Sequence, residues 1–93
     1  MSHPTYQKPP PGLVGRVSLF ATLEVPRRRW QQDQDGCRVE LRRRLEQVAA
    51  SIPTPSYRLA GDPQVTLTRP AWDRTRPRAG WIVLYGRGSG VPA

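Results

Sequence analysis

The chain has little of the chemistry that most enzymes and metal sites need. It contains one histidine and one cysteine in 93 residues. His3 lies near the start in a proline-rich segment, so a nucleophile would lack a positioned base, and a zinc site would lack its ligands. A lone Cys37 also excludes an intrachain disulfide and therefore a secreted disulfide scaffold. We expect a protein that is not an enzyme and has no cofactor and no metal site.

Long apolar runs are also missing. No run approaches the roughly 20 apolar residues of a membrane span, and the opening "MSHPTYQKPPPG" has no apolar signal-peptide core. No glycine-rich segment joins a strand to a helix, so a phosphate-cradling loop is not predicted. We expect a cytoplasmic protein, or a component of a particle assembled there, that makes no membrane contact.

Acidic residues are scarce. Seven Asp and Glu stand against fifteen Lys and Arg, which gives a net charge of +8. Fourteen of the fifteen cations are arginine and only Lys8 is lysine. GC-rich codon usage explains arginine in place of lysine, but it does not explain the shortage of acids. A surplus of this size attracts polyanions such as DNA, RNA, anionic lipid or an acidic protein.

The length allows one domain at most. Residues 1–14 are rich in proline and have little to bury, which predicts a flexible arm with polyproline II character around "KPPPG". Residues 88–93 are predicted to be a flexible tail, which leaves a single domain over residues 15–87. A domain this small buries only about 60% of its unfolded surface, so its core stabilises it narrowly.

Two segments carry clear periodicity. Residues 16–25 alternate between apolar and mostly polar side chains, which predicts a half-buried strand. A helix is expected from about Asp35 to Ser51, because apolar residues recur there at spacings of three and four. The stripe consists of Cys37, Leu41, Leu45, Val48 and Ile52. Asp33 or Asp35 can cap the helix, the prolines of "IPTP" end it, and Cys37 is expected to be a small buried residue.

The remaining segments complete an α+β pattern. Residues 27–32, after Pro26, are expected to be a loop or the frayed opening of the helix. "SYRL" (56–59) and "QVTLT" (64–68) flank the turn signal "AGDP" and are expected to form a hairpin. "WIVLY" (81–85) is the last strand. The order predicts one helix packed on a small antiparallel sheet.

The last strand is apolar on both faces, although a strand with one wet face should alternate. One helix covers only one side of a sheet, so Phe20, Ile82 and Leu84 are predicted to form an apolar patch on the other. Three interpretations are open: the N-terminal arm folds over this patch, the patch is merely a small exposed one, or it is an interface with a partner. We favour a homodimer or a protein partner, because so small a core would be stabilised by it.

The loop at residues 69–78 is the strongest candidate for a binding site. Its candidate contact residues are Arg69, Trp72, Arg74, Arg76 and Arg78. Asp73 alone opposes the arginines, and two prolines lower the entropy lost on ordering. The Trp72 ring can stack on a base or on a guanidinium. In the alternative interpretation Trp72 packs on the sheet edge, and the arginines merely solvate an ordinary loop.

Two other arginine clusters differ in how well acids balance them. Arg27, Arg28 and Arg29 are poorly balanced and are expected to extend the basic track of the loop. The helix arginines are spaced i,i+4 from glutamates, as in Glu40–Arg44 and Arg42–Glu46, which is typical of a solvated helix face.

The sequence therefore favours a small protein that binds nucleic acid, DNA or RNA, mainly through phosphate contacts. Base-specific readout is expected to be secondary, because no recognition helix is evident. The alternative is a structural or adaptor subunit of a larger assembly, such as a phage particle or a multi-protein complex. In that case the apolar sheet face and the two terminal arms would bind protein neighbours.

Overall fold

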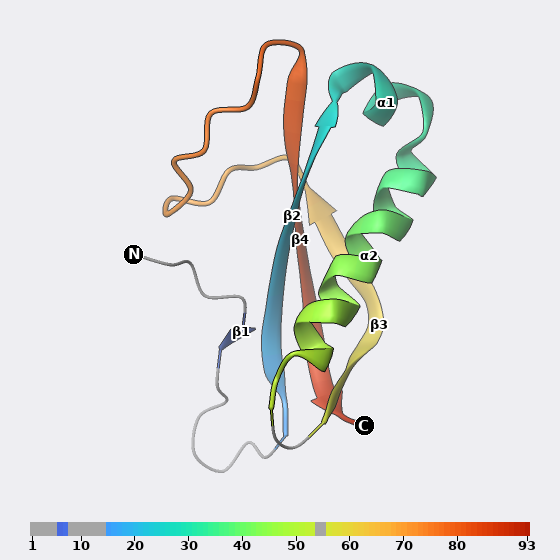
Figure 1. Cartoon of the computed structure of the whole chain (residues 1–93), viewed down its shortest axis with the longest axis vertical. Helices are drawn as coiled ribbons and strands as arrows, with labels where there is room; N and C mark the ends of the chain where they lie inside the picture. Colours follow the sequence, from blue (N-terminus) through green and yellow to red (C-terminus); the bar gives the residue numbers. More distant parts are fainter. Residues whose placement is uncertain (1–5, 8–14, 54–55) are drawn as a thin grey trace.

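The computed structural model describes residues 6–7, 15–53 and 56–93. Its elements follow in the order β1 (Tyr6–Gln7), β2 (Val17–Pro26), α1 (Arg27–Gln32), α2 (Gln34–Ala50), β3 (Tyr57–Thr66) and β4 (Trp81–Pro92). The strands form one antiparallel sheet in the order β1-β2-β4-β3, and α2 lies along one side of it (Figure 1). The predicted α+β class, with one main helix on an antiparallel sheet, is confirmed.

Of the predicted N-terminal arm, only Tyr6–Gln7 lies among these residues, and there β1 pairs with Leu19 and Ser18 of β2. The rest of that arm, including His3 and Lys8, lies outside the described residues.

The helix follows its predicted stripe closely. Asp33 has a non-helical backbone (φ −146°, ψ 66°), and its carboxylate accepts a hydrogen bond from the Gly36 backbone N–H at 2.9 Å. This is the expected cap, and it separates α1 from α2. Residues 27–32, expected as a loop or a frayed helix opening, are thus a short helix of their own. Cys37 is fully buried and burial raises the pKa of its thiol, as suits an inert core residue.

The core lies between α2 and the sheet in two adjoining clusters. The first contains Val17, Leu19, Leu45, Ala49, Ile52 and Leu59. The second contains Leu23, Val25, Cys37, Leu41, Ile82 and Leu84, with Trp30 of α1 packed against it. The alternation predicted for β2 is confirmed, since its core residues are buried while Thr22 and Glu24 on its other face are exposed. Within the described ranges, no helix is long and apolar enough to cross a membrane.

The prediction that Ile82 and Leu84 lie on the uncovered side of the sheet was wrong. In β4, Leu84 pairs with Leu23 and Ile82 pairs with Val25. Directly paired residues of antiparallel strands share a face, so both side chains point toward α2. Leu84 is 0% exposed and Ile82 is 9% exposed. Neither can contribute to an interface while the domain is folded.

The prediction of a hairpin around "AGDP" was also wrong. Residues 57–66 form one strand, β3, which pairs with β4 on one side, and its register shifts between Ala60 and Gln64. The turn-forming residues produce this irregularity: Gly61 has a φ of 67°, and Pro63 has no N–H to donate. An edge strand tolerates both, because its outer side pairs with no other strand of the sheet.

The C-terminal segment 88–93, predicted to be a flexible tail, was the third error. β4 continues to Pro92, and Gly90 pairs with Val17 of β2 on one side and with Leu59 of β3 on the other. Beyond the strand, the Ala93 backbone N–H donates to the Ser56 carbonyl at 2.9 Å. The segment therefore belongs to a central strand of the sheet, which lies between β2 and β3.

Glycine at alternate positions makes this pairing possible. A Cβ at Gly86 would lie 2.8 Å from Leu41 Cδ2, and one at Gly88 would lie 2.6 Å from Leu59 Cδ1. Both contacts are far closer than carbon atoms pack, so core leucines occupy the space that other side chains would fill. The glycines are a packing surface for the core.

Candidate functional site

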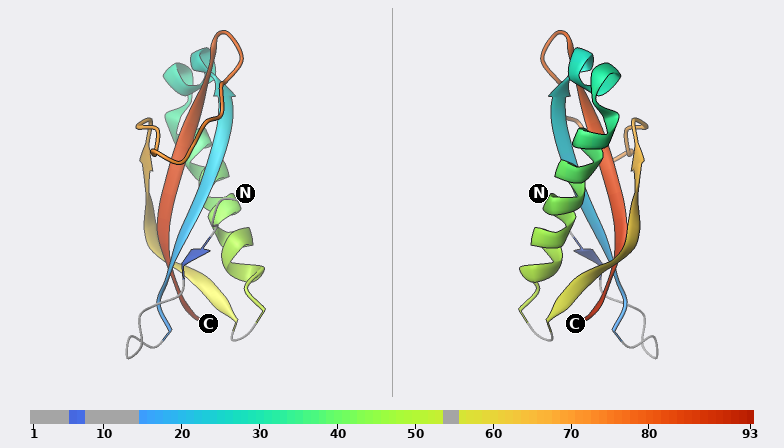
Figure 2. Two further views of the ribbon diagram at one scale, coloured as in Figure 1. Left: turned by 90° about the vertical axis from the view of Figure 1, so that its left-hand side faces the viewer. Right: turned by 90° about the vertical axis from the view of Figure 1, so that its right-hand side faces the viewer.

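Residues 67–80, which connect β3 to β4, lie on the side of the sheet opposite α2 (Figure 1, Figure 2). We call this side the open face. Its paired positions include Phe20 with Arg87 and Thr22 with Tyr85. The Tyr85 hydroxyl donates a hydrogen bond to the carboxylate of Asp73 in the connecting segment. The connection is thus anchored on the open face. It covers part of the side of the sheet that was predicted to be uncovered.

Asp73 is the anchor of this loop. It is only 5% exposed, and its Oδ1 accepts a hydrogen bond from the Thr75 backbone N–H at 2.8 Å. The hydrogen bonds from Tyr85 and then from Thr75 lower the pKa of Asp73 to about 2. Burial, and then the bond to Asp73, raise the pKa of the Tyr85 phenol. The sequence showed Asp73 only as a counter-charge, because its partner Tyr85 is twelve positions away.

Two of the predicted contact residues brace the loop. The Arg69 guanidinium donates to the Thr75 backbone carbonyl. The Arg78 guanidinium stacks 3.8 Å from the centroid of the Trp81 ring, and its Nε lies 3.6 Å from Glu24 Oε1. Both arginine side chains therefore make contacts within the protein, although both residues remain exposed.

Arg74 and Arg76 are the exposed cations of the loop. Within the part of the chain that the structure describes, neither side chain takes part in a hydrogen bond, an ion pair or a ring contact. They follow directly on the anchored Asp73, so their backbone is held while their guanidinium groups face solvent. This is an arrangement suited to contacting an external anion.

The structure brings Arg27, the first arginine of the 27–29 run, next to this loop. The Arg27 backbone N–H donates to the Gly80 carbonyl at 2.8 Å, which joins the start of α1 to the end of the loop. Arg27 lines one groove together with Arg69 and Pro77. Arg28, the next residue of α1, is exposed. Two clusters that are about forty residues apart in sequence thus meet.

Arg29, the third of that run, is used elsewhere. Its two terminal nitrogens each lie 3.3 Å from a carboxylate oxygen of Glu40 in α2. The hydrogen bond and the charge of Glu40 raise the pKa of Arg29. This pair joins α1 to α2, and it leaves Arg29 out of the candidate site.

The helix arginines form only one of the two expected i,i+4 pairs. Arg42 Nε lies 3.2 Å from Glu46 Oε1, and Arg42 also contacts Asp62 at 2.7 Å. The Glu40–Arg44 pair does not form, because Glu40 binds Arg29 and the Arg44 guanidinium donates to the Thr22 carbonyl at 2.9 Å.

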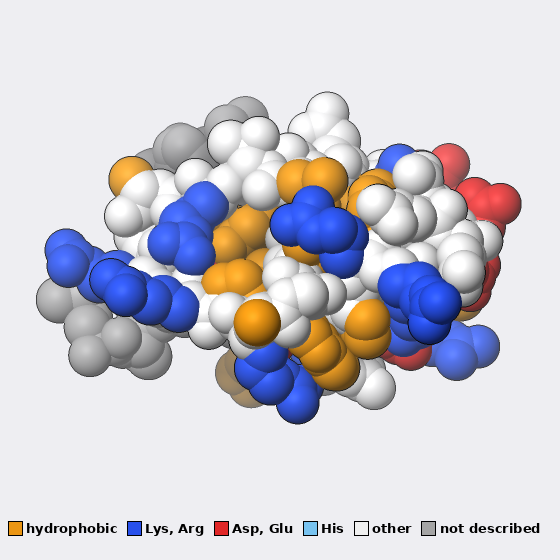
Figure 3. Space-filling view, turned by 90° about the horizontal axis from the view of Figure 1, so that it is seen from above, with side chains coloured by type: hydrophobic (Ala, Val, Ile, Leu, Met, Phe, Trp, Pro, Cys, Tyr) orange, Lys and Arg blue, Asp and Glu red, His pale blue; other side chains and the backbone are white. Residues whose placement is uncertain are grey.

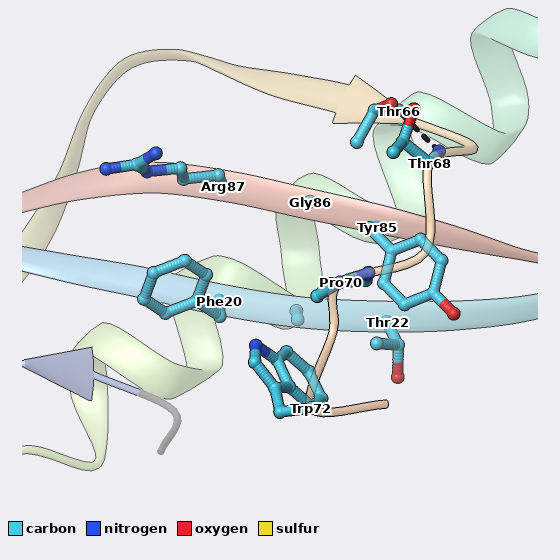
Figure 4. Close-up of a pocket in the computed structure, with 10 residues that line it drawn as sticks. Phe20, Thr22, Thr66, Thr68, Pro70, Trp72, Tyr85, Gly86 and Arg87 are labelled. Atoms are coloured by element: carbon cyan, nitrogen blue, oxygen red, sulfur yellow. Dashed lines mark hydrogen bonds between the residues drawn. The ribbon is translucent and has the colours of Figure 1, made fainter. Parts of the chain in front are cut away.

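Trp72 lies over the open face with 39% of its surface exposed. Together with Phe20 it lines a pocket of about 360 Å³ between the loop and the sheet (Figure 4). Seen from above the molecule, Arg side chains are spread over the surface around apolar side chains, whereas Asp and Glu side chains gather mainly at one side (Figure 3).

Comparison with protein-family models, with curated proteins and with solved structures found no match to this chain. The candidate site therefore rests on geometry and charge: an anchored loop, four outward-facing arginines from two segments, and an aromatic pocket beside them.

We expect the Asp73 anchor to make stability depend on acid pH. The pKa of Asp73 is about 2 in the folded protein, below its ordinary value. A depressed carboxylate pKa stabilises the folded state above the unfolded pKa, and this stabilisation is lost as pH falls from about 4 toward 2. The urea midpoint of the wild type should therefore exceed that of Asp73→Asn at pH 6, and the gap should narrow at pH 2.

Tyr85→Phe is the companion variant, since it keeps the ring and removes the donor. In a Tyr85→Phe background, replacing Asp73 by Asn should lower the urea midpoint at pH 6 by less than it does in the wild type. Amide exchange in residues 69–78 should be faster in each single variant than in the wild type. A gap between the wild type and Asp73→Asn that stays constant from pH 6 to pH 2 would contradict the anchoring role.

Proposed function

We propose that the protein binds nucleic acid, chiefly through phosphate contacts made by the loop 67–80 and the start of α1. The hydrogen bond from the Arg27 N–H to the Gly80 carbonyl, at 2.8 Å, is the observation that carries this proposal. It places the start of α1 beside the end of the loop, and Arg27 lines a groove together with Arg69 and Pro77. A continuous cationic surface attracts a polyanion more strongly than two separated patches.

The arginines of this surface divide into two roles. Arg69 and Arg78 hold the loop in shape through Thr75, Glu24 and Trp81. Four others extend to solvent as the expected phosphate contacts: Arg27, Arg28, Arg74 and Arg76. A loop that is already ordered loses less conformational entropy on binding, so more of the interaction free energy remains as affinity.

Backbone contacts are favoured over base-edge readout. The apolar side of α2 is buried on the sheet, and on its outer side Arg42 is engaged by Glu46 and Asp62. Of the helices that the structure describes, α2, the long one, is thus not prepared to enter a major groove as a recognition helix. Phosphates are common to DNA and RNA, so these contacts serve both.

The structural or adaptor alternative has less support. It drew on an apolar sheet face made by Phe20, Ile82 and Leu84, and two of these three lie in the core under α2. The loop 67–80 also lies over part of that face (Figure 2). Phe20 alone remains from the proposed interface, so the argument for a homodimer or a protein partner is weakened with it.

The test is a titration of labelled duplex and single-stranded oligonucleotides at 50 and 200 mM salt. If four phosphates are neutralised, log K should fall with log salt at a slope of about −3.6 on duplex DNA and about −2.8 on single strands. Affinity for duplex should then drop about 150-fold between the two conditions. Absence of binding at 50 mM salt would end the proposal.

A further inference from the structure

The open face carries a pocket that phosphate contacts do not explain. It measures about 360 Å³ and lies between strands β2 and β4 on one side and the loop on the other. Phe20 and Tyr85 belong to the strands, and Pro70 and Trp72 belong to the loop (Figure 4). We infer that this pocket receives one unpaired base of a single-stranded nucleic acid, an inference that rests on the proposed function.

Aromatic rings from two elements supply stacking surfaces. Phe20 is half-buried on the sheet and Trp72 is 39% exposed on the loop, and in Figure 4 the two rings lie near each other on the same side of the sheet. Every base has a π-face, so stacking on such rings tolerates any sequence.

The size of the pocket favours a single base. Small-molecule sites measure roughly 300–1,000 Å³, so a pocket of about 360 Å³ fits one base with part of its sugar and excludes a duplex. A paired base is covered on both faces by its neighbours and cannot stack on a side chain. The ligand must therefore be single-stranded, or have an unstacked nucleotide.

Hydroxyl groups at the pocket suit base edges. Thr22, Thr66 and Thr68 line it, and Thr66 Oγ1 accepts a hydrogen bond from the Thr68 backbone N–H at 3.0 Å. A hydroxyl both donates and accepts, so Thr66 keeps its own proton for an acceptor on the ligand. Such groups can satisfy any base without selecting one.

The charge at the pocket fits a nucleotide better than an apolar peptide. Arg87 lines it, with its guanidinium carbon 5.7 Å from the centroid of the Phe20 ring. Among the residues described at the pocket none is acidic. A base on Phe20 would therefore carry its phosphate toward a cation, on the same side of the sheet as the arginine loop.

The experiment separates bases from phosphates. Binding of a twelve-residue thymidine strand is compared with that of an abasic strand of equal length, which keeps the phosphates and lacks the bases. Removing a stacking partner weakens single-strand binding by about 5- to 150-fold per base. We expect the thymidine strand to bind at least about fivefold more tightly at equal salt.

Variants of the two rings assign this preference to the pocket. Phe20→Leu and Trp72→Leu keep apolar volume but remove the π-face, so each should bring the ratio of the two affinities toward one. The affinity for the abasic strand should stay unchanged. Tyr57→Leu is the matched control, because Tyr57 is aromatic and belongs to β3 but lines neither this pocket nor the groove at the arginines. It should leave the ratio as in the wild type.

The outcomes distinguish this inference from the function on which it rests. Binding of neither strand at 50 mM salt would overturn both. Equal binding of the two strands would overturn the base pocket and leave phosphate binding intact. A thymidine preference that persists in both ring variants would also overturn it. Sedimentation showing a dimer that Phe20→Leu dissociates would assign the pocket to a second copy of the chain.

Discussion

Ile82→Lys is expected to unfold the domain, whereas Val83→Lys, one position further along β4, should leave it folded. Ile82 packs in the core cluster under α2 and is 9% exposed. An ammonium group there would be buried without a partner, which costs on the order of 3–5 kcal/mol or more. A small domain has about 5 kcal/mol to lose. Urea unfolding followed by circular dichroism measures the difference.

Val83 is the matched control because it lies on the same strand and faces the other way. It pairs with Glu24 of β2, so a lysine introduced there would meet an opposite charge. Equal stability of the two variants would contradict the register between β2 and β4. Loss of folding in Ile82→Lys also means that this change cannot serve as a probe of self-association.

The error over Ile82 and Leu84 shows what periodicity can and cannot supply. In β2 the alternation is clear, so the buried side of that strand was predicted correctly. In "WIVLY" both sides are apolar, and nothing local tells which side meets the core. The pairing of Leu84 with Leu23 decides it, and register between distant strands depends on the whole sheet.

The glycines of β4 were misread for a different reason. "GRGSG" has a composition that is typical of flexible linkers, and composition alone therefore predicts a tail. Gly86, Gly88 and Gly90 are two apart, which is the period of one strand face. They lie toward the core, where Leu41 and Leu59 fill the space beside them. A signal was therefore present in the sequence, but only a known neighbour gives it meaning.

The candidate site was predicted as a set of residues and not as an arrangement. The loop 69–78 and the run at 27–29 were both identified from their charge. Some of these arginines form ion pairs within the protein, and the sequence does not reveal their partners. Examples are Glu40 for Arg29 and Glu24 for Arg78. The meeting of Arg27 with Gly80 likewise required the fold.

The largest functional effect is expected from replacing the four outward-facing arginines together by glutamine. The variant changes Arg27, Arg28, Arg74 and Arg76, and leaves the bracing Arg69 and Arg78 in place. Four lost phosphate contacts should flatten the salt slope on duplex DNA by about 3.6. Between 50 and 200 mM salt the affinity of the wild type should therefore fall about 150-fold, whereas that of the variant should hardly change. Circular dichroism should show an unchanged fold.

A charge-matched variant separates location from net charge. It replaces four arginines outside the site by glutamine: Arg16, Arg38, Arg43 and Arg58. Removing four charges from +8 leaves both variants at +4, so long-range attraction of a polyanion falls similarly in the two. Direct contacts are lost in only one of them, because a phosphate is neutralised only where a guanidinium touches it. The control should therefore keep most of the wild-type slope, and equal flattening in both variants would mean that charge alone, without the loop and the start of α1, accounts for binding.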